Sequence, residues 1–408
     1  MKKKICLITS GQPSINPRLV KEADALAEAG YEVIVVAVFY TAWADKADKD
    51  LCADKKWKLF FTGGSPTNKK FLYFLTRIRH RIAKELFKLG SHEVTLNAAV
   101  IRTTPDLIKQ AKKIKADLYI AHNLGALPAA VIAAQENKAK AGFDAEDFHS
   151  GEQSSDHQRT LIAELLERKY LPLCDYITAA SGPIAQAYAQ KYAIPEPAAI
   201  LNVFPLRFLQ EQQGEPLNAG LSLYWFSQVI GLDRGLQDVL LAMGKVKKEV
   251  HLYLQGKVTA ECRSQLMAIA LENGIPEERI HFLPPCLPDD LFKVAAQFDI
   301  GLALEQRQPL NRDLCLTNKI FTYLLAGLSV IATETQGQKF IIGSIGRGGW
   351  MFKAGDIQAL AARIEFLYGN REELKNSKLE VLKQARERYN WDIESNKFLD
   401  VIRKVLAK

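Results

Sequence analysis

The chain has 408 residues, of which 48% are apolar and 25% charged, and at about 150 residues per domain this length predicts two or three domains. The composition excludes a disordered or low-complexity chain. Lysine and arginine number 54 against 46 acidic residues, so the net charge of +8 favours anionic partners: nucleotides, phosphates, anionic lipids or nucleic acids.

The first 40 residues predict a βαβ unit. An apolar run at 5–9 predicts a buried strand. Asn16 followed by Pro17 predicts the start of a helix that ends at Gly30, and a second strand is predicted at 33–39. A strand, a helix and a strand in so short a segment indicate parallel pairing.

The alternation of strands and helices continues along both halves of the chain. Further strands are predicted at 117–121, 142–143, 176–180, 198–203, 221–226, 250–255, 279–283, 299–304, 329–333 and 350–352. Helices are predicted at about 126–136, 158–170 and 183–192, with two or three more over 356–408. This pattern predicts an α/β protein with two Rossmann-like, doubly wound parallel-sheet domains that face a cleft.

Prolines and glycines between Pro195 and Gly220 predict the domain boundary. We expect an N-terminal Rossmann-like domain at 1–205, a linker at 206–220 and a second Rossmann-like domain at 221–388. Ligands in such sheets bind beyond the carboxyl ends of the strands, so the cleft between the domains is the expected site.

The glycines exclude two common nucleotide-binding motifs. Gly11 follows the first strand without a GxGxxG pattern, Gly63-Gly64 follow no predicted strand, and GxxxxGK[ST] is absent. The chain is therefore neither a dinucleotide oxidoreductase nor a P-loop NTPase by these signatures. The glycines at 343–349 predict a turn before the strand at 350–352.

Three side chains are candidates for chemistry at strand and helix ends. His122 ends an apolar strand, where a neutral imidazole could bind a substrate hydroxyl or transfer a proton, or could simply bond to backbone at a turn. Arg234 precedes a helix and suits a diphosphate, although a surface arginine is the alternative. Lys319 lies in the first turn of a helix that begins at Thr317 or Asn318, where it opposes the helix dipole unless an anion binds.

Seven potential ligands crowd the segment 144–157. They are Asp144, Glu146, Asp147, His149, Glu152, Asp156 and His157. Neither HExxH nor DxDxDG spacing is present, so we expect a solvated or acceptor-binding loop rather than a metal site.

The segment 71–89 predicts an amphipathic helix rich in basic residues. One face carries Phe71, Phe74, Leu75, Ile78, Ile82, Leu86 and Leu89. Lys69, Lys70, Arg77, Arg79, Arg81, Lys84 and Lys88 surround it, against the single acid Glu85. Two interpretations stay open: a helix that lies on an anionic membrane surface, or a domain helix with a solvated basic face. Nucleic-acid binding has little support, because aromatic and basic residues interleave nowhere else.

The cysteines and the N-terminal residues indicate the cellular compartment of the protein. The six cysteines are scattered without a CxxC pair, which fits a reducing cytosol. The apolar run at 5–9 is too short for a signal peptide, and no run of about 18 apolar residues occurs. We expect a cytoplasmic protein, and the membrane interpretation of 69–89 would add peripheral attachment at the inner face of the membrane.

Several segments, taken in order, carry a resemblance to a known family. They are Asn16-Pro17-Arg18, DLYIAHNLGALP at 117–128, Asp233-Arg234-Gly235, TNKIFTYLLAGLSVIAT at 317–333 and Tyr389-Asn390-Trp391. In order and spacing the chain resembles retaining glycosyltransferases of the GT-B fold, glycosyltransferase family 4. The resemblance covers nearly the whole chain and implies that the last helix, at 389–408, packs back on the N-terminal domain.

The resemblance also implies the ligands and their sites. It implies a nucleoside diphosphate sugar bound by the second domain and an acceptor bound by the first, with no metal and no cofactor. The implied catalytic residues are His122 and Arg234. The implied donor-binding residues are Gly11, Arg234, Asn318, Lys319 and Thr322, and the implied acceptor-binding residues are Arg18, Asp144, Glu146 and His149.

Three departures from the family pattern bear on activity. The glutamates of the family's ExxxxxxxE motif fall on Leu314 and Thr322, Thr317 replaces a proline, and Ser227-Gln228 replace a glycine–cation pair. We therefore expect a retaining, metal-independent glycosyltransferase that acts on a glycan or lipid-linked acceptor. The alternative is a GT-B binding or scaffold protein with impaired catalysis. A nucleotide-sugar epimerase has less support, because no pair of acids for proton shuttling is evident.

Overall fold

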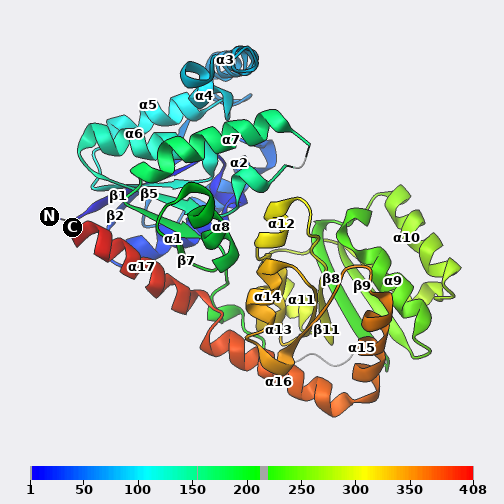
Figure 1. Ribbon diagram of the computed structural model, residues 1–408. Helices are drawn as coiled ribbons and strands as arrows, with labels where there is room; N and C mark the ends of the chain where they lie inside the picture. The colour runs from blue at the N-terminus through cyan, green and yellow to red at the C-terminus, as the bar shows by residue number, and fades with distance from the viewer. Residues whose placement is uncertain (1, 154, 212–218, 408) are drawn as a thin grey trace. The chain divides into compact units, whose positions relative to one another are not determined.

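The computed structural model describes residues 2–153, 155–211 and 219–407, which divide into two compact units (Figure 1). The first unit runs to Leu201 and also includes Pro309–Asn311 and the residues from Ser395 on. The second unit comprises Asn202–Gln308 and Arg312–Glu394. Each unit is built on one parallel sheet, so the predicted fold class, two Rossmann-like α/β domains, is confirmed.

The sheet of the first unit has seven parallel strands in the order β3-β2-β1-β4-β5-β6-β7. The strands are β1 (Lys4–Thr9), β2 (Glu32–Val38), β3 (Lys58–Thr62), β4 (Leu118–His122), β5 (Lys140–Ala145), β6 (Tyr176–Ala179) and β7 (Ala198–Ala199). The strand order reverses between β1 and β4, and the last residues of these strands, Thr9 and His122, are register partners. Ligands of such sheets bind at this reversal, beyond the carboxyl ends of the strands.

Helices cover both faces of this sheet. They are α1 (Pro17–Glu28), α2 (Ala42–Cys52), α3 (Lys70–Lys88), α4 (His92–Ala99), α5 (Thr104–Lys113), α6 (Leu127–Asn137), α7 (His157–Tyr170), α8 (Gly182–Tyr192) and α17 (Trp391–Ala407). Figure 1 shows α5, α6 and α7 along one side of the sheet and α17 along the other. The start of α1 is as predicted: the Asn16 side chain accepts a hydrogen bond from the Leu19 amide, and Pro17 is the first helical residue.

One expectation about the glycines is wrong. Gly63-Gly64 directly follow a strand, β3, which the sequence pattern does not predict. β3 is the edge strand of the sheet, and Phe60 and Phe61 are 43% and 47% exposed. An edge strand that is open to solvent lacks the continuous apolar run by which buried parallel strands are found.

The sheet of the second unit has six parallel strands in the order β10-β9-β8-β11-β12-β13. The strands are β8 (Leu221–Val229), β9 (Val250–Lys257), β10 (Ile280–Leu283), β11 (Ile300–Ala303), β12 (Ser329–Thr333) and β13 (Gly349–Phe352). The helices are α9 (Leu236–Lys245), α10 (Ala260–Glu272), α11 (Leu291–Ala295), α12 (Leu310–Leu314), α13 (Asn318–Ala326), α14 (Gln336–Ile342), α15 (Ile357–Gly369) and α16 (Arg371–Glu387). The strand order reverses between β8 and β11, which repeats the arrangement of the first unit.

The core of the second unit lies between its sheet and the helices α9, α10 and α15. Leu223 and Leu252 from the sheet, Leu240 from α9, Leu266 from α10 and Ile364 from α15 are fully buried in one cluster. Burial of each such side chain contributes about 1.5–3 kcal/mol, which holds the carboxyl ends of the strands in fixed positions.

The chain crosses between the units after Leu201 and returns at Ser395. Part of the predicted linker, 212–218, lies outside the described residues. Within the described part of the chain, no helix has both the length and the apolar composition needed to cross a bilayer.

Candidate functional site

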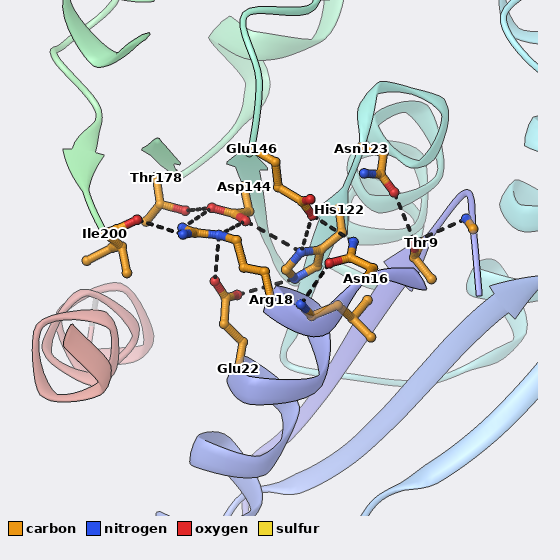
Figure 2. Close-up of polar contacts among 12 residues, drawn as sticks. Thr9, Asn16, Arg18, Glu22, His122, Asn123, Asp144, Glu146, Thr178 and Ile200 are labelled. Atoms are coloured by element: carbon orange, nitrogen blue, oxygen red, sulfur yellow. Dashed lines mark hydrogen bonds and ion pairs between the residues drawn. The ribbon is translucent and has the colours of Figure 1, made fainter. Parts of the chain in front are cut away.

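A buried ion pair joins α1 to the end of β5 in the first unit (Figure 2). The Arg18 guanidinium donates to both carboxylate oxygens of Asp144, with a distance of 2.7 Å between Nη2 and Oδ1. Its Nη1 also donates to the Ile200 carbonyl at 2.6 Å, and Thr178 donates its hydroxyl to Asp144 at 2.7 Å. Both side chains of the pair are 1% exposed. This bidentate pair therefore links α1, β5, β6 and the chain after β7 without contact with solvent.

His122, at the end of β4, lies fully buried among three carboxylates. Its Nε2 lies 3.2 Å from Glu22 Oε2, and its Nδ1 lies 3.1 Å from Glu146 Oε1 and 3.5 Å from Asp144 Oδ2. Nδ1 makes a hydrogen bond with Glu146, whereas Nε2 faces Glu22 without hydrogen-bond geometry. The negative charge of the surrounding carboxylates favours the ring as an imidazolium. The arrangement differs from the neutral imidazole that the sequence suggested.

The pKa values of this network follow from burial and from the neighbouring charges. Burial lowers the pKa of His122, but the charge of Glu22 and the hydrogen bond with Glu146 outweigh it and raise that pKa to about 10. Burial and the charge of Asp144 raise the pKa of Glu22. Burial opposes ionisation of Asp144, yet the charge and hydrogen bonds of Arg18 hold the pKa of Asp144 below its usual value. The cations thus keep Asp144 charged although it is buried.

Glu146 is the member of this network that reaches solvent, with a side chain 19% exposed. The Asn16 side chain donates to Glu146 Oε1 at 2.7 Å while its own oxygen caps α1. The start of α1 therefore positions Glu146. Three of the four predicted acceptor-binding residues, Arg18, Asp144 and Glu146, are brought together here.

His149, the fourth of these residues, lies outside the network on a 3-10 turn after β5. Its ring bonds to the Glu152 carboxylate, and its amide donates to the Tyr188 hydroxyl at 3.2 Å. Burial lowers the pKa of His149, but the hydrogen bond and charge of Glu152 raise it to about 9.

A pocket of about 440 Å³ opens next to His149 in the first unit. Its walls come from the ends of β1 and β4, the 3-10 turn, α3 and α7. Among its lining residues are Ser10, Asn123, Asp147, His149, Glu152, His80, Lys84 and Arg159. Asn123 has a left-handed backbone with φ of 69°, and the Thr9 hydroxyl donates to its side-chain oxygen at 3.0 Å. The pocket is polar on the side of the turn.

Gly11, a predicted donor-binding residue, also lies at this edge of the first unit. Its amide donates to Thr9 Oγ1 at 3.1 Å, and its carbonyl accepts from the Val38 amide at 3.1 Å. A Cβ at this position would meet Ile15 Cδ1 at 3.3 Å. Close packing of the loop against its own side chain therefore accounts for the glycine.

In the second unit, two of the predicted cations line one narrow recess at the ends of β8 and β11, which is too small in this structure to hold a water molecule. Arg234, Lys319 and Glu305 surround it, together with Trp225. The Lys319 ammonium lies 2.7 Å from Glu305 Oε1 and 5.7 Å from the centre of the Trp225 ring. Although burial raises the pKa of Glu305, the charge and hydrogen bond of Lys319 bring it below its usual value. Glu305 is therefore an anion that faces the lysine in the first turn of α13.

Arg234 is the more accessible cation of this recess. Its side chain is 35% exposed, and its Nε lies 3.4 Å from the neighbouring Asp233 carboxylate. Arg312 approaches the other oxygen of Asp233 at 3.5 Å. An exposed arginine beside a shared, exposed carboxylate can exchange that partner for a stronger anion.

The remaining donor-binding candidates lie on α13. Asn318 is exposed at the start of the helix. Thr322 is fully buried, and its hydroxyl donates to the Asn318 carbonyl at 3.0 Å. Leu314, at the position of the other motif glutamate, is buried as well. Arg234 and Lys319 are thus brought together in the second unit, with Asn318 beside Lys319 at the start of α13, whereas His122 and Gly11 belong to the first.

Two charged residues of these sites are not among the predicted ones. Glu22 lies four residues after Arg18, so the two share the buried face of α1. Glu305 comes directly after the strand predicted at 299–304. Two signals in the sequence could have indicated them. Glu22 forms a pair of opposite charges with Arg18 on the apolar face of a helix, and Glu305 is an acid at the end of a buried strand.

Glu22, His122 and Asp144 form a cluster whose ligand atoms lie within 4.8 Å of one another. Arg18 occupies both oxygens of Asp144, and both nitrogens of His122 face carboxylates. A protonated ring offers no lone pair, and a guanidinium within the cluster repels a cation. The carboxylates of this cluster are therefore better suited to bind the protonated His122 ring and the Arg18 guanidinium than a metal ion.

Sequence and structure comparisons show a likeness to glycosyltransferases. Residues 223–370 match the family described as glycosyl transferases group 1. A search of curated protein sequences found no match. Among solved structures, HepE from Anabaena in complex with UDP has a TM-score of 0.70 at 14% identity, over 98% of this chain and 100% of that chain. HepE has also been solved in complex with UDP-glucose.

Two further structures show the same likeness. A glycosyltransferase from Rickettsia africae has a TM-score of 0.73 at 12% identity, over 99% of each chain. Sucrose-phosphate synthase from Thermosynechococcus elongatus has a TM-score of 0.72 at 13% identity, over all of both chains. The second unit thus carries a glycosyl transferases group 1 domain, and the fold is GT-B. The predicted resemblance is confirmed, and the domain matched in the second unit is of the predicted enzyme class, a glycosyltransferase.

The buried ion pair yields a prediction about stability. We expect Arg18→Met to lower the free energy of unfolding by about 3–5 kcal/mol, because Asp144 and Glu22 would stay buried without their cation. Urea denaturation measures this loss. Arg403→Met is the control: its partner Asp400 is exposed, so the loss there should be at most about 1 kcal/mol. Equal losses in the two variants would contradict the assigned role.

The imidazolium yields a prediction about pH. The pKa of His122 is raised from 6.5 to about 10, so its stabilising contribution is complete below pH 6.5 and disappears as the pH rises through 10. Lys21 acts in the opposite sense over the same range, because burial and the charge of Arg18 lower its pKa to about 7. The measurement is therefore the difference in unfolding free energy between wild type and His122→Gln. This difference should shrink between pH 7 and pH 10, and a constant difference would refute the charged ring.

Proposed function

We propose that the protein is a retaining glycosyltransferase that transfers a sugar from a nucleoside diphosphate sugar to a hydroxyl of a glycan or lipid-linked acceptor, without a metal ion. The observation that carries this proposal is the pair of cations, Arg234 and Lys319, at the reversal of strand order in the second unit. The likeness to HepE, solved with UDP and with UDP-glucose, supports this class of donor.

The recess of the second unit suits a diphosphate for three reasons. The first amides of α13 have no partner within the helix and point toward its N-terminal end. Lys319, in the first turn, adds an ammonium that Glu305 holds in place. Arg234 adds a guanidinium with a fork of donors, and the carboxylate nearest to it, Asp233, is exposed.

The chemistry needs stabilisation of a leaving diphosphate more than it needs a base. The bond between the anomeric carbon and the diphosphate oxygen breaks, and the acceptor oxygen bonds to that carbon on the same face. The acceptor proton passes to the departing phosphate oxygen, so no protein carboxylate has to attack. Arg234 and Lys319 then stabilise the charge that develops on the diphosphate, which is the largest catalytic contribution available to such a site.

The pocket of the first unit is our candidate for the acceptor. Its polar side chains, Asp147, His149 and Glu152, offer acceptors and a donor for sugar hydroxyls. Glu146, whose carboxylate Asn16 and His122 position, is the network member that can reach a ligand. In this proposal His122 acts as a fixed positive charge and orients Glu146.

A second candidate function follows from the positions of the missing glutamates. Leu314 is apolar, and the Thr322 hydroxyl is engaged with the helix backbone, so neither binds ribose as a carboxylate would. A GT-B scaffold protein that does not turn over a nucleotide sugar is the alternative that this observation favours.

Nucleotide-sugar binding distinguishes the two candidates. We expect at least one of the UDP-, GDP- and ADP-sugars to raise the melting temperature of the protein. Arg234→Gln should weaken the binding of that sugar nucleotide by roughly 10- to 100-fold, because a charge-assisted hydrogen bond of about 1.5–3 kcal/mol is lost. Arg307→Gln is the matched control, since Arg307 is 68% exposed and lies outside the residues that line the recess. If no nucleotide sugar binds, the scaffold function replaces the enzyme.

The stereochemistry and the metal requirement are tested on the product. With the donor identified, NMR of the first product formed should show the anomeric configuration of the donor sugar. Release of the nucleoside diphosphate should be unchanged by EDTA, since Arg234 and Lys319 supply the positive charge. An inverted product, or loss of activity that Mg²⁺ or Mn²⁺ restores, would contradict these parts of the proposal.

A further inference from the structure

Helix α3 presents a strip of large apolar side chains to solvent. The strip consists of Phe71, Phe74, Leu75, Ile78, Ile82, Leu86 and Leu89, all of them exposed. Phe71 and Leu89, at its two ends, are 77% and 80% exposed. At 3.6 residues per turn, these positions fall within about 60° of one line along the helix, so they form one continuous strip roughly 28 Å long.

This strip is not the face by which α3 packs on its own unit. The buried residues of the helix are Thr76, Ala83 and Phe87, which lie on its opposite side. An amphipathic helix of a soluble domain normally turns its apolar strip toward the core. Here the packing face is narrow and the larger apolar face is uncovered. A contiguous exposed apolar surface of this kind indicates a binding surface.

Basic side chains run along one edge of the strip. They are Lys70, Arg77, Arg81 and Lys88, whose spacing of four and seven residues places them on the same side of the helix. Lys70, Arg77, Arg81 and Lys88 are exposed. The single acid of α3, Glu85, bonds to Lys88 at 2.9 Å and leaves a large excess of positive charge.

We propose that α3 docks on an anionic lipid bilayer, with the apolar strip inserted among the lipids and the basic edge against their headgroups. Aromatic and aliphatic residues on one face, with lysine and arginine on the polar side, are the features of helices that lie in the membrane interface. The charge selects anionic lipid, because each basic residue near such a surface contributes to binding. A straight ridge of seven side chains suits a fluid bilayer, which needs no shaped partner groove.

The same helix forms a wall of the acceptor pocket. His80 and Lys84, on the side of α3 away from the strip, line that pocket. The His80 ring bonds to the Ala98 carbonyl at 2.8 Å, and Gln158 of α7 donates to the Lys84 carbonyl at 3.0 Å, so this wall is fixed. The bilayer would lie about one helix diameter, roughly 10 Å, from the pocket.

The position of α3 between the pocket and the bilayer relates the docking surface to the proposed reaction. An acceptor whose sugar head occupies the pocket could keep its lipid in the bilayer on the other side of α3. This last step rests on the proposed function and names the acceptor class as lipid-linked. The docking of α3 on the bilayer stands without it.

Vesicle flotation tests the proposal. Wild type should float with vesicles of phosphatidylcholine and phosphatidylglycerol, and much less with phosphatidylcholine alone. A charge variant (Arg77→Glu, Arg81→Glu, Lys88→Glu) should bind the anionic vesicles at least tenfold more weakly. Its control carries the same change of charge on the second unit (Lys245→Glu, Lys247→Glu, Lys257→Glu), where all three side chains are exposed, and should bind like wild type.

A second variant tests the apolar strip. Phe74→Ser with Ile78→Ser and Ile82→Ser should abolish flotation at moderate salt, whereas Leu271→Ser with Leu379→Ser, both exposed on the second unit, should not. Circular dichroism checks that each variant folds. Equal flotation of wild type and both α3 variants would overturn the proposal. The proposal would also be overturned if wild type forms a dimer and does not float, and if the Ser variant is a monomer. The strip would then bind a second copy of the chain.

The flotation result is independent of catalysis. Flotation with no nucleotide-sugar binding would leave the docking surface standing and refute the proposed function alone. Nucleotide-sugar binding without flotation would refute the docking surface alone. If both hold, transfer of labelled sugar into the solvent-extractable lipid of bacterial membranes should fall at least tenfold in the charge variant. Undiminished transfer would overturn the lipid-linked acceptor.

Discussion

The reversal of strand order beside the first strand of each sheet is the constraint on which both candidate sites depend. Strands on either side of the reversal send their connections to opposite faces, so a crevice forms at the carboxyl ends of β1 and β4, and of β8 and β11. His122 ends β4, Glu305 follows β11, and Arg234 follows β8. Polar side chains therefore gather at these edges, where parallel α/β sheets bind their ligands.

Each buried cation at these edges already has an anion from the protein. Arg18 pairs with Asp144, His122 with Glu22 and Glu146, and Lys319 with Glu305. A buried charge without a partner would be too costly in free energy, so the pairs are the condition under which charged groups can stay in place before a substrate arrives. In the second unit, a bound diphosphate would therefore share Lys319 with Glu305. The more exposed Arg234 would change its contacts most when the ligand binds.

In the proposed reaction, the two sites bind different substrates. The second unit offers positive charge at a helix start, which suits the donor diphosphate, and the first unit offers a polar pocket and a rigid carboxylate network, which suit an acceptor. The absence of glutamate at Leu314 and Thr322 removes the usual carboxylates from the donor side. In the proposed reaction, donor selection would then rest on other contacts of the second unit. The outward apolar strip of α3 is a third surface, on the helix that also lines the pocket of the first unit.

Local patterns in the sequence determined the elements and their order. The cap at Asn16 and Pro17, the buried apolar runs and the turn glycines depend on neighbouring residues only, and they predict α1, most of the strands and the α/β class. The same patterns predict cations at the starts of helices, because Arg234 and Lys319 are defined by their place next to a strand or a cap. Strand β3 was missed because an edge strand open to solvent has no buried run.

Only the tertiary structure decided the partners of the charges and the direction of the helical faces. Arg18 meets Asp144 across 126 positions of the chain, and no local pattern reports such a contact. The sequence predicts that α3 has an apolar face, but whether that face turns inward or outward depends on which side the rest of the unit covers. Burial is a property of the folded surroundings, so the charge of His122 and the exposure of α3 could be determined only once the chain had folded.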